Sequence, residues 1–174
     1  DLLKHADTAM YQAKAAGRGT FVRYDEQMDE AVRRRATIAS ALRKVLDREE
    51  LRVVYQPRMS VRDSRIVGVE ALLRWTSAEH GEIPPTTFIP LAEESGMILE
   101  IGEWVLREAC LTLQRWRQHG GLEDISMAVN VSALRLSRGD LPAVVERVLA
   151  ESRLPAERLE LELTESVIMA GTDY

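Results

Sequence analysis

Apolar and polar positions alternate with two different periods along this chain, and the change of period divides it into three regions. Residues 1–16 place leucine, alanine and methionine at helical spacing, and the Gly-Arg-Gly at 17–19 predicts a stop before a short strand at 20–24. Residues 25–50 keep a helical spacing with many charges, which predicts a long connector helix. From Leu51 onward β-rich runs alternate with amphipathic helices, a pattern typical of β/α units.

The third region contains the clearest elements. Two β-rich runs, 51–57 and 65–75, flank a turn-like segment and predict a hairpin or a neighbouring pair of strands. An apolar stripe from Ile98 to Trp116 predicts a helix that ends at the His-Gly-Gly of 119–121. The order then continues with a strand at 125–132, a helix at 140–152 and a strand at 159–166.

Successive side chains of a strand point to opposite faces, so parity sorts the charged residues of these strands. Glu70 and Arg74 share one face of the second strand, opposite Val69, Ala71 and Trp75. By the same parity, the polar face of the next strand carries Asn130, and that of the last strand carries Glu162; the other faces are bulky and apolar, suited to covering helices. Polar groups gathered at strand ends are how β/α barrels build active sites.

Two carboxylates and an amide oxygen are hard ligands suited to Mg²⁺ or Mn²⁺, and an arginine beside them suits a phosphate oxygen. A second interpretation is equally compatible with the spacing. In it, Glu70 and Arg74 form a buried ion pair, and Asn130 only satisfies the end of its strand.

Composition narrows the class of protein. The chain has 174 residues, 45% hydrophobic and 29% charged, which is typical of a globular domain, and its net charge of −5 argues against a surface for nucleic-acid polymers. The sequence shows no membrane-spanning run and no signal peptide, so a cytoplasmic setting is expected. The single Cys110 is predicted to be a buried apolar residue, and the three histidines lack ligand spacing.

Four ordered blocks carry a resemblance to a known family. The segments VYQPRMSVRDSRIVGVEALLRW, IPPTTFIPLAEESGMILEIGEWVLREAC, AVNVSALRL and LELELTESVIM resemble the first half of an EAL domain, the cyclic di-GMP phosphodiesterase family. The segment ADTAMYQAKAAGRGTFVRYD resembles the last helix and strand of a GGDEF domain, the diguanylate cyclase family. In that segment Lys14 and Arg18 match residues that contact nucleotide phosphates, but Gly19 replaces the usual asparagine and the GGDEF signature itself is absent.

The resemblance implies an α/β fold, the N-terminal half of a TIM-like (β/α) barrel of EAL type preceded by a connector helix and a C-terminal remnant of an α/β GGDEF domain. The corresponding boundaries are 1–26 for the GGDEF remnant, 27–47 for the connector helix and 48–174 for the truncated EAL domain. The family's later aspartates, lysine, glutamate and glutamine would lie beyond Tyr174. We therefore expect a parent protein that is longer and active, and a 174-residue piece that is inactive by itself.

The resemblance also assigns roles to residues of this chain. The implied metal ligands are Glu70, Asn130 and Glu162, with Glu70 also catalytic; Gln56 and Arg74 would bind substrate; Glu165 would support a loop over the site.

The implied reaction is hydrolysis of one phosphodiester bond of cyclic di-GMP to linear pGpG with Mg²⁺ or Mn²⁺ by a homodimeric parent protein. Two alternatives remain open, a catalytically silent cyclic di-GMP receptor and a scaffold in which all of these residues are structural.

Overall fold

The computed structural model describes residues 2–15, 19, 21–120 and 122–163. The chain divides into two compact units, Asp1–Lys44 and Val45–Tyr174. The described part contains no helix long and apolar enough to cross a membrane.

The first unit contains two helices, α1 (Leu2–Ala15) and α2 (Glu26–Leu42). Asp25 caps α2, because its carboxylate accepts the backbone N–H of Gln27 at 3.1 Å. The rings of His5 and Tyr24 stack with their centroids 4.0 Å apart, which holds the segment before α2 against α1. The strand predicted at 20–24 is wrong for its described residues, 21–24, which form no strand. A strand needs a partner for its backbone groups, and the described part of this unit offers none.

The connector helix is shorter than the periodicity of residues 25–50 predicts, since α2 ends at Leu42 and a series of turns follows. The backbone at Glu49 is left-handed, with φ of 53°, and Glu50 is engaged by the sheet that follows. These tertiary contacts override a helical pattern that the local sequence would allow to continue.

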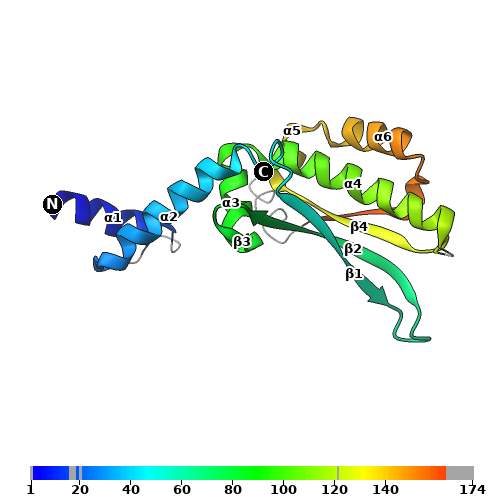
Figure 1. Ribbon diagram of the computed structural model, residues 1–174, viewed down its shortest axis with the longest axis horizontal. Coiled ribbons are helices and arrows are strands. Elements are labelled where there is room, and N and C mark those ends of the chain that lie inside the picture. Colours follow the sequence, from blue (N-terminus) through cyan, green and yellow to red (C-terminus); the bar gives the residue numbers. More distant parts are fainter. Residues whose placement is uncertain (1, 16–18, 20, 121, 164–174) are drawn as a thin grey trace. The chain divides into compact units, whose positions relative to one another are not determined.

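The second unit is a mixed sheet with helices on one side (Figure 1). Its strands are β1 (Leu51–Met59), β2 (Ile66–Ser77), β3 (Gly81–Ile83), β4 (Ser126–Val131) and β5 (Leu159–Leu163). Its helices are α3 (Pro85–Ser95), α4 (Ile98–His119), α5 (Ala133–Arg138), α6 (Leu141–Ser152) and the short 3₁₀ helix η1 (Ala156–Arg158).

The sheet order is β1-β2-β4-β5, with β3 paired to the end of β2. β1 and β2 form an antiparallel hairpin, which confirms that prediction, whereas β2, β4 and β5 run parallel. The strands at 125–132 and 159–166 and the helices at 98–116 and 140–152 also occur where they were predicted, as far as residue 163. Sequence periodicity missed α5, because a helix of 6 residues is shorter than two turns.

One face of the sheet packs against the helices and forms the core. Trp75 is 1% exposed and meets Phe88 of α3 edge-on, with ring centroids 5.5 Å apart. Met127 and Val129 of β4 are buried, and so is Leu113 of α4. Each such side chain contributes about 1.5–3 kcal/mol when it is fully removed from water. Cys110 is also buried there, as predicted, and burial raises the pKa of its thiol to about 12.

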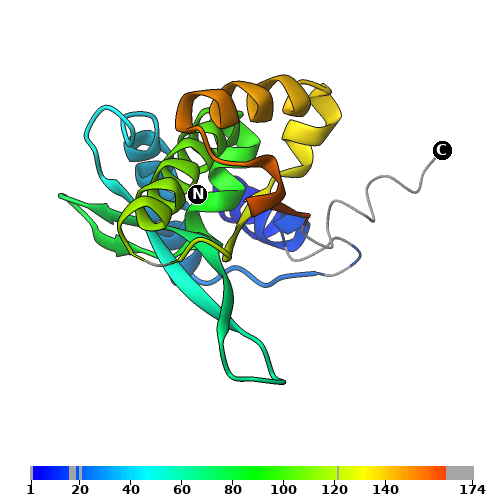
Figure 2. The same ribbon diagram turned by 90° about the vertical axis from the view of Figure 1, so that its right-hand side faces the viewer.

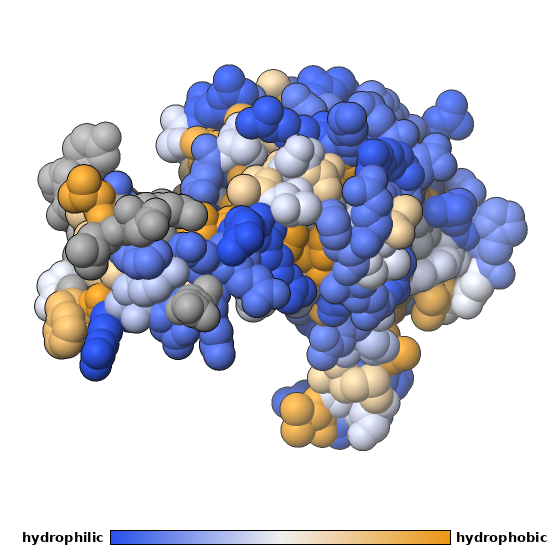
Figure 3. Space-filling model, turned by 60° about the vertical axis from the view of Figure 1, so that its left-hand side comes forward, coloured by the Kyte–Doolittle hydropathy of each residue, from blue (hydrophilic) through white to orange (hydrophobic). Residues whose placement is uncertain are grey.

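The β1–β2 hairpin extends away from α4 and α6 (Figure 2). Its end carries exposed apolar side chains, visible as orange atoms among blue ones in Figure 3: Met59, Val61, Ile66 and Val67.

Candidate functional site

The face of the sheet opposite the helices collects polar side chains from all four main strands. Cross-strand partners share a face, so the hairpin register and the two parallel registers determine its members. They are Arg52, Gln56 and Arg58 of β1, Glu70 and Arg74 of β2, Ser126 and Asn130 of β4, and Glu160 and Glu162 of β5. We call this surface the polar face. The parity argument from sequence had placed Glu70, Asn130 and Glu162 on one side, and the structure confirms this.

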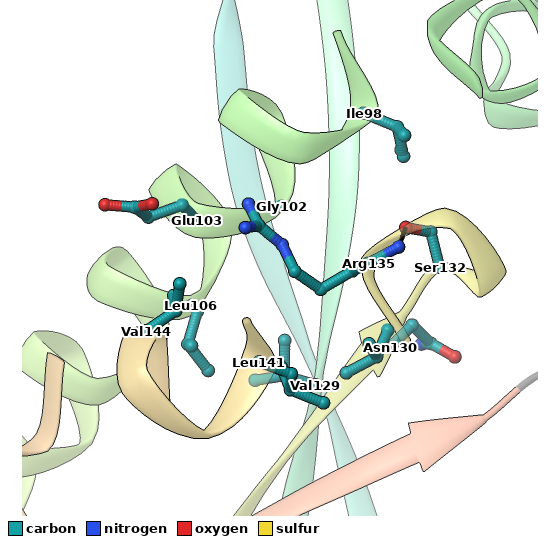
Figure 4. Close-up of a pocket in the computed structure, with 11 residues that line it drawn as sticks. Ile98, Gly102, Glu103, Leu106, Val129, Asn130, Ser132, Arg135, Leu141 and Val144 are labelled. Carbon is teal, nitrogen blue, oxygen red and sulfur yellow. Dashed lines mark hydrogen bonds between the residues drawn. The ribbon is translucent and has the colours of Figure 1, made fainter. Parts of the chain in front are cut away.

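Glu70 and Asn130 are in direct contact on the polar face. Asn130 Nδ2 donates a hydrogen bond of 2.8 Å to Glu70 Oε1. In Figure 4 the Asn130 amide turns away from Leu141 and Val144, which line the helix side of β4. A side-chain amide carries a donor and an acceptor, so half a rotation would present Oδ1 in place of Nδ2. The Asn130 amide can therefore present its NH₂ group to the Glu70 carboxylate, as it does here, or its oxygen to a cation.

Glu162 lies opposite Asn130 in the register of β4 and β5, but its contact is with β1. Arg58 Nη1 donates to Glu162 Oε1 at 3.2 Å, while Nη2 donates to Glu160 Oε2 at 2.5 Å and to Ser126 Oγ at 3.1 Å. The Ser126 hydroxyl in turn donates to Glu160 Oε1. We call Arg58, Ser126, Glu160 and Glu162 the arginine cluster. Sequence reasoning missed Arg58, and the signal that could have found it is the hairpin register, which puts it on the polar face.

The arginine cluster favours the ionised form of Glu160 and lowers its pKa. Hydrogen bonds from Ser126 and Arg58, together with the positive charge of Arg58, hold the pKa of Glu160 below its ordinary value of 4.5, against a smaller opposing effect of burial. At neutral pH Glu160 is therefore a negatively charged partner of Arg58, in addition to Glu162.

Arg74 does not pair with Glu70. Its Nη1 donates to the carbonyl of Leu73 at 2.9 Å, and no ion pair joins Arg74 to Glu70 in the described part of the chain. The alternative interpretation of a buried Glu70–Arg74 pair is therefore wrong. Arg74 and Asn130 both line a cavity of about 310 Å³ between the end of β2, α3 and α4. Gln56 is opposite Glu70 in the hairpin, and its side chain is exposed.

Some predicted residues cannot be placed. Glu165 and Arg18 lie outside the described residues, and so does the side chain of Lys14. Within the described residues, no group of three histidine, cysteine, aspartate or glutamate side chains is close enough together to hold a metal ion. The structure thus joins Glu70 to Asn130 and places Glu162 beside Arg58.

A smaller cavity of about 50 Å³ lies on the helix side, between α4, α5 and α6 (Figure 4). Arg135 is its main polar residue, with a side chain that is 10% exposed. Its guanidinium pairs with Asp140 at 3.0 Å and donates to the carbonyl of Leu99. These contacts attach the segment after Asn130 to the start of α4.

The fold and the polar face define a class of protein. The family model described as EAL domain matches residues 39–173, and the chain belongs to that family. It is 41% identical over 167 residues to an uncharacterized signaling protein of Caulobacter vibrioides, covering 96% of this chain and 20% of that protein. It is 40% identical over 173 residues to the bifunctional diguanylate cyclase/cyclic di-GMP phosphodiesterase MucR of Pseudomonas aeruginosa, covering 99% and 25%. With the cyclic di-GMP phosphodiesterase PdeR of Escherichia coli it shares 38% identity over 172 residues, covering 99% and 26%.

Solved structures agree with this assignment. The phosphodiesterase PaMucR in its c-di-GMP complex aligns with a TM-score of 0.74 and 42% identity, over 79% of this chain and 55% of that chain. The FimX EAL domain from Pseudomonas aeruginosa bound to c-di-GMP aligns with a TM-score of 0.65 and 27% identity, over 76% and 52%. The chain spans about a fifth to a quarter of the length of the curated relatives described above.

Proposed function

We propose that this chain is the metal-binding half of an EAL domain that hydrolyses cyclic di-GMP to linear pGpG. The observation that carries the proposal is the single polar face on which Glu70, Asn130 and Glu162 lie, in a chain of the EAL family. The alignment with a phosphodiesterase in complex with c-di-GMP supports the choice of substrate. We expect the parent protein to be a homodimer and to act in the cytoplasm.

The donor set fits a divalent cation. Two carboxylates and one amide oxygen are hard ligands of the kind that Mg²⁺ and Mn²⁺ prefer. Glu70 and Glu162 each use Oε1 for a hydrogen bond, and Oε2 of each has no partner among the described residues. A cation held there would supply Lewis-acid chemistry toward water and phosphate. Glu70 and Glu162 would provide negative charge, and Asn130 would turn its oxygen toward the cation.

Two further residues, Arg74 and Gln56, are assigned to the substrate, and a third, Glu165, to a loop over the site. Arg74 lines the cavity at the end of β2, where its guanidinium can offset charge on a phosphate oxygen of cyclic di-GMP. Gln56 stands opposite Glu70 with an exposed amide that can orient the nucleotide. We assign Glu165, three residues after Glu162, to support of a loop over the site.

We also infer the larger architecture. The sheet, with parallel β2, β4 and β5 separated by helices, is proposed to be the N-terminal half of a TIM-like (β/α) barrel. Residues 1–26 are proposed to end a GGDEF domain, 27–47 to be a connector helix and 48–174 to belong to the EAL domain. The MucR alignment supports this, because it covers 99% of the chain, including the residues before the family match at residue 39. A GGDEF signature upstream of Asp1 in the longer protein is the expected finding; an unrelated domain there would contradict it.

The test compares Glu162→Gln with Glu165→Gln in the complete EAL domain that contains this chain. Glu162 lies on the polar face, so its change should weaken Mn²⁺ binding, and raised Mn²⁺ should partly restore hydrolysis. In the strand that the sequence predicts at 159–166, Glu165 has the opposite parity, so its change is expected to lower turnover with little change in Mn²⁺ affinity and without rescue. Equal shifts in Mn²⁺ affinity for the two variants would refute the assignment.

Binding and hydrolysis assays of the wild-type domain distinguish the phosphodiesterase from the receptor and the scaffold. Binding of cyclic di-GMP by the wild-type domain without formation of pGpG, at any Mg²⁺ or Mn²⁺ concentration, would identify a catalytically silent receptor. Absence of both binding and hydrolysis would leave the scaffold hypothesis.

A further inference from the structure

Arg58 reaches from β1 to β5 although β2 and β4 lie between these strands. Its path is open because its cross-strand partner on β2 is Gly68. A Cβ atom at position 68 would lie 2.7 Å from Ser126 Oγ and 2.8 Å from Arg58 Nη2, both closer than real Cβ contacts. Any side chain at this position must therefore displace the guanidinium or Ser126.

The Arg58 guanidinium is oriented by hydrogen bonds at one of its two terminal nitrogens, Nη2. Glu160 and Ser126 both engage Nη2, and the planar fork of an arginine then determines the direction of Nη1. Nη1 points at Glu162 Oε1. Glu160 is itself held by the Ser126 hydroxyl, so two side chains from two strands, Ser126 of β4 and Glu160 of β5, fix the direction in which Arg58 meets Glu162.

Among the contacts of the described residues, Glu162 is held through one oxygen. Arg58 engages Oε1, which leaves Oε2 for a cation on the polar face. The side chains of Arg58 and Glu162 are 33% and 38% exposed, so solvent weakens their attraction, and orientation is the larger effect. A partner that fixes one oxygen of a ligating carboxylate is a common means of orienting metal ligands.

We propose that Arg58 is a positioning residue that holds the Glu162 carboxylate in the orientation needed for metal binding, a role that rests on the proposed function above. Gly68 is part of the same device, since it leaves the space through which Arg58 passes. The competing interpretation is that the arginine cluster only stabilises the sheet.

The test measures Mn²⁺ affinity in the absence of substrate, by the loss of the free Mn²⁺ signal in electron paramagnetic resonance, on the complete EAL domain that contains this chain. Arg58→Leu removes the donors and the positive charge and should raise the Kd for Mn²⁺ about tenfold. Gly68→Ala keeps every charge but displaces Arg58 or the Ser126 hydroxyl that orients it, and should also raise the Kd for Mn²⁺. Arg58→Lys should give an intermediate Kd, because one ammonium group replaces the fork.

The matched control is Arg65→Leu. Arg65 lies near the end of the same hairpin, pairs with Asp63 at 2.6 Å and has a side chain that is 81% exposed. Its change should leave the Kd for Mn²⁺ within about twofold, as surface ion pairs contribute little.

Thermal unfolding of each variant separates positioning from stability. Variants that unfold earlier but bind Mn²⁺ with the wild-type Kd would overturn the proposal, and so would tighter binding by Arg58→Leu, which would mean that Arg58 competes with the ion. If Arg58→Leu does not fold, the Kd for Mn²⁺ of Gly68→Ala and Arg58→Lys tests the proposal: a wild-type Kd in both would overturn it. A wild-type domain that does not bind Mn²⁺ would refute the proposed function itself, and this role with it.

Discussion

At the scale of single residues, Glu50 shows how a charged side chain holds this fold together. Its side chain is 6% exposed, and its carboxylate accepts two hydrogen bonds, from Trp75 Nε1–H at 2.9 Å and from the Ala78 N–H at 3.1 Å. Its backbone carbonyl accepts the N–H of Thr76 at 3.1 Å. One residue before β1 thereby secures the end of β2, and local sequence gives no sign of it.

Replacement of this carboxylate should destabilise the domain. Glu50→Gln leaves one acceptor oxygen for two donors and turns an NH₂ toward one of them, so the free energy of unfolding should fall by about 1–3 kcal/mol. Glu82→Gln is the control. Glu82 pairs with Arg52 at the surface, with side chains 77% and 52% exposed, so its change should alter stability by less than about 1 kcal/mol. Urea unfolding measures both; equal midpoints would contradict the role given to Glu50.

The same contacts make the stability contributed by Glu50 dependent on pH. Burial acts to raise the pKa of Glu50, but hydrogen bonds from Trp75 and Ala78 and the charge of Arg48 outweigh it, so the pKa lies below 4.5. A group with a lowered folded pKa stabilises the fold fully above its unfolded pKa and loses this effect as the pH falls through the folded value. The difference in stability between wild type and Glu50→Gln should therefore be constant near neutral pH and shrink below about pH 4.5.

At the scale of elements, α5 connects the polar face to the helices. Ser132 follows β4 with φ of −74° and ψ of 150°, and its hydroxyl accepts the N–H of Arg135 at 3.3 Å, so it caps the helix. Asn130 is two residues earlier on the same strand end. The spacing of asparagine and serine thus has a physical reason: one side chain faces the site and the other starts the helix that supports it.

Loss of this cap should weaken α5. Ser132→Ala should lower the free energy of unfolding by about 1 kcal/mol and increase hydrogen exchange at the Arg135 amide, whereas Ser132→Asp should keep the cap. Ser137→Ala is the matched control, since Ser137 is on the same helix and its hydroxyl donates to the Leu134 carbonyl at 2.9 Å instead of capping the helix. Similar exchange at Arg135 in Ser132→Ala and Ser137→Ala would show that the hydroxyl of Ser132 is not the cap.

At the scale of the whole chain, the apolar face is incompletely covered at one end. β5 is an edge strand of the described sheet, and Leu161 and Leu163 are 37% and 45% exposed. Unpaired strand edges and exposed apolar side chains favour pairing with other chains.

We expect the isolated 174-residue chain to self-associate with rising concentration and not to hydrolyse cyclic di-GMP, because it aligns with 55% of PaMucR and would lack the remaining ligands that the family resemblance implies. Sedimentation velocity should show association that Leu161→Lys reduces. Turnover by this chain alone would refute the second expectation.

The sequence alone predicted four of the strands, β1, β2, β4 and β5 as far as residue 163, the hairpin of the first two and the common face of Glu70, Asn130 and Glu162, but not the short β3. It could do so because period and parity are local properties of the backbone. Tertiary structure alone determined that α2 ends at Leu42. The same is true of the ion pairs of Arg58 and the hydrogen bonds of Glu50. Arg58 and Glu162 are 104 residues apart, and only the order and register of four strands bring them within hydrogen-bond distance. The sequence around each residue does not indicate which side chains it will contact across a sheet. The common face of Glu70, Asn130 and Glu162 could therefore be predicted, whereas the contacts of the arginine cluster could not.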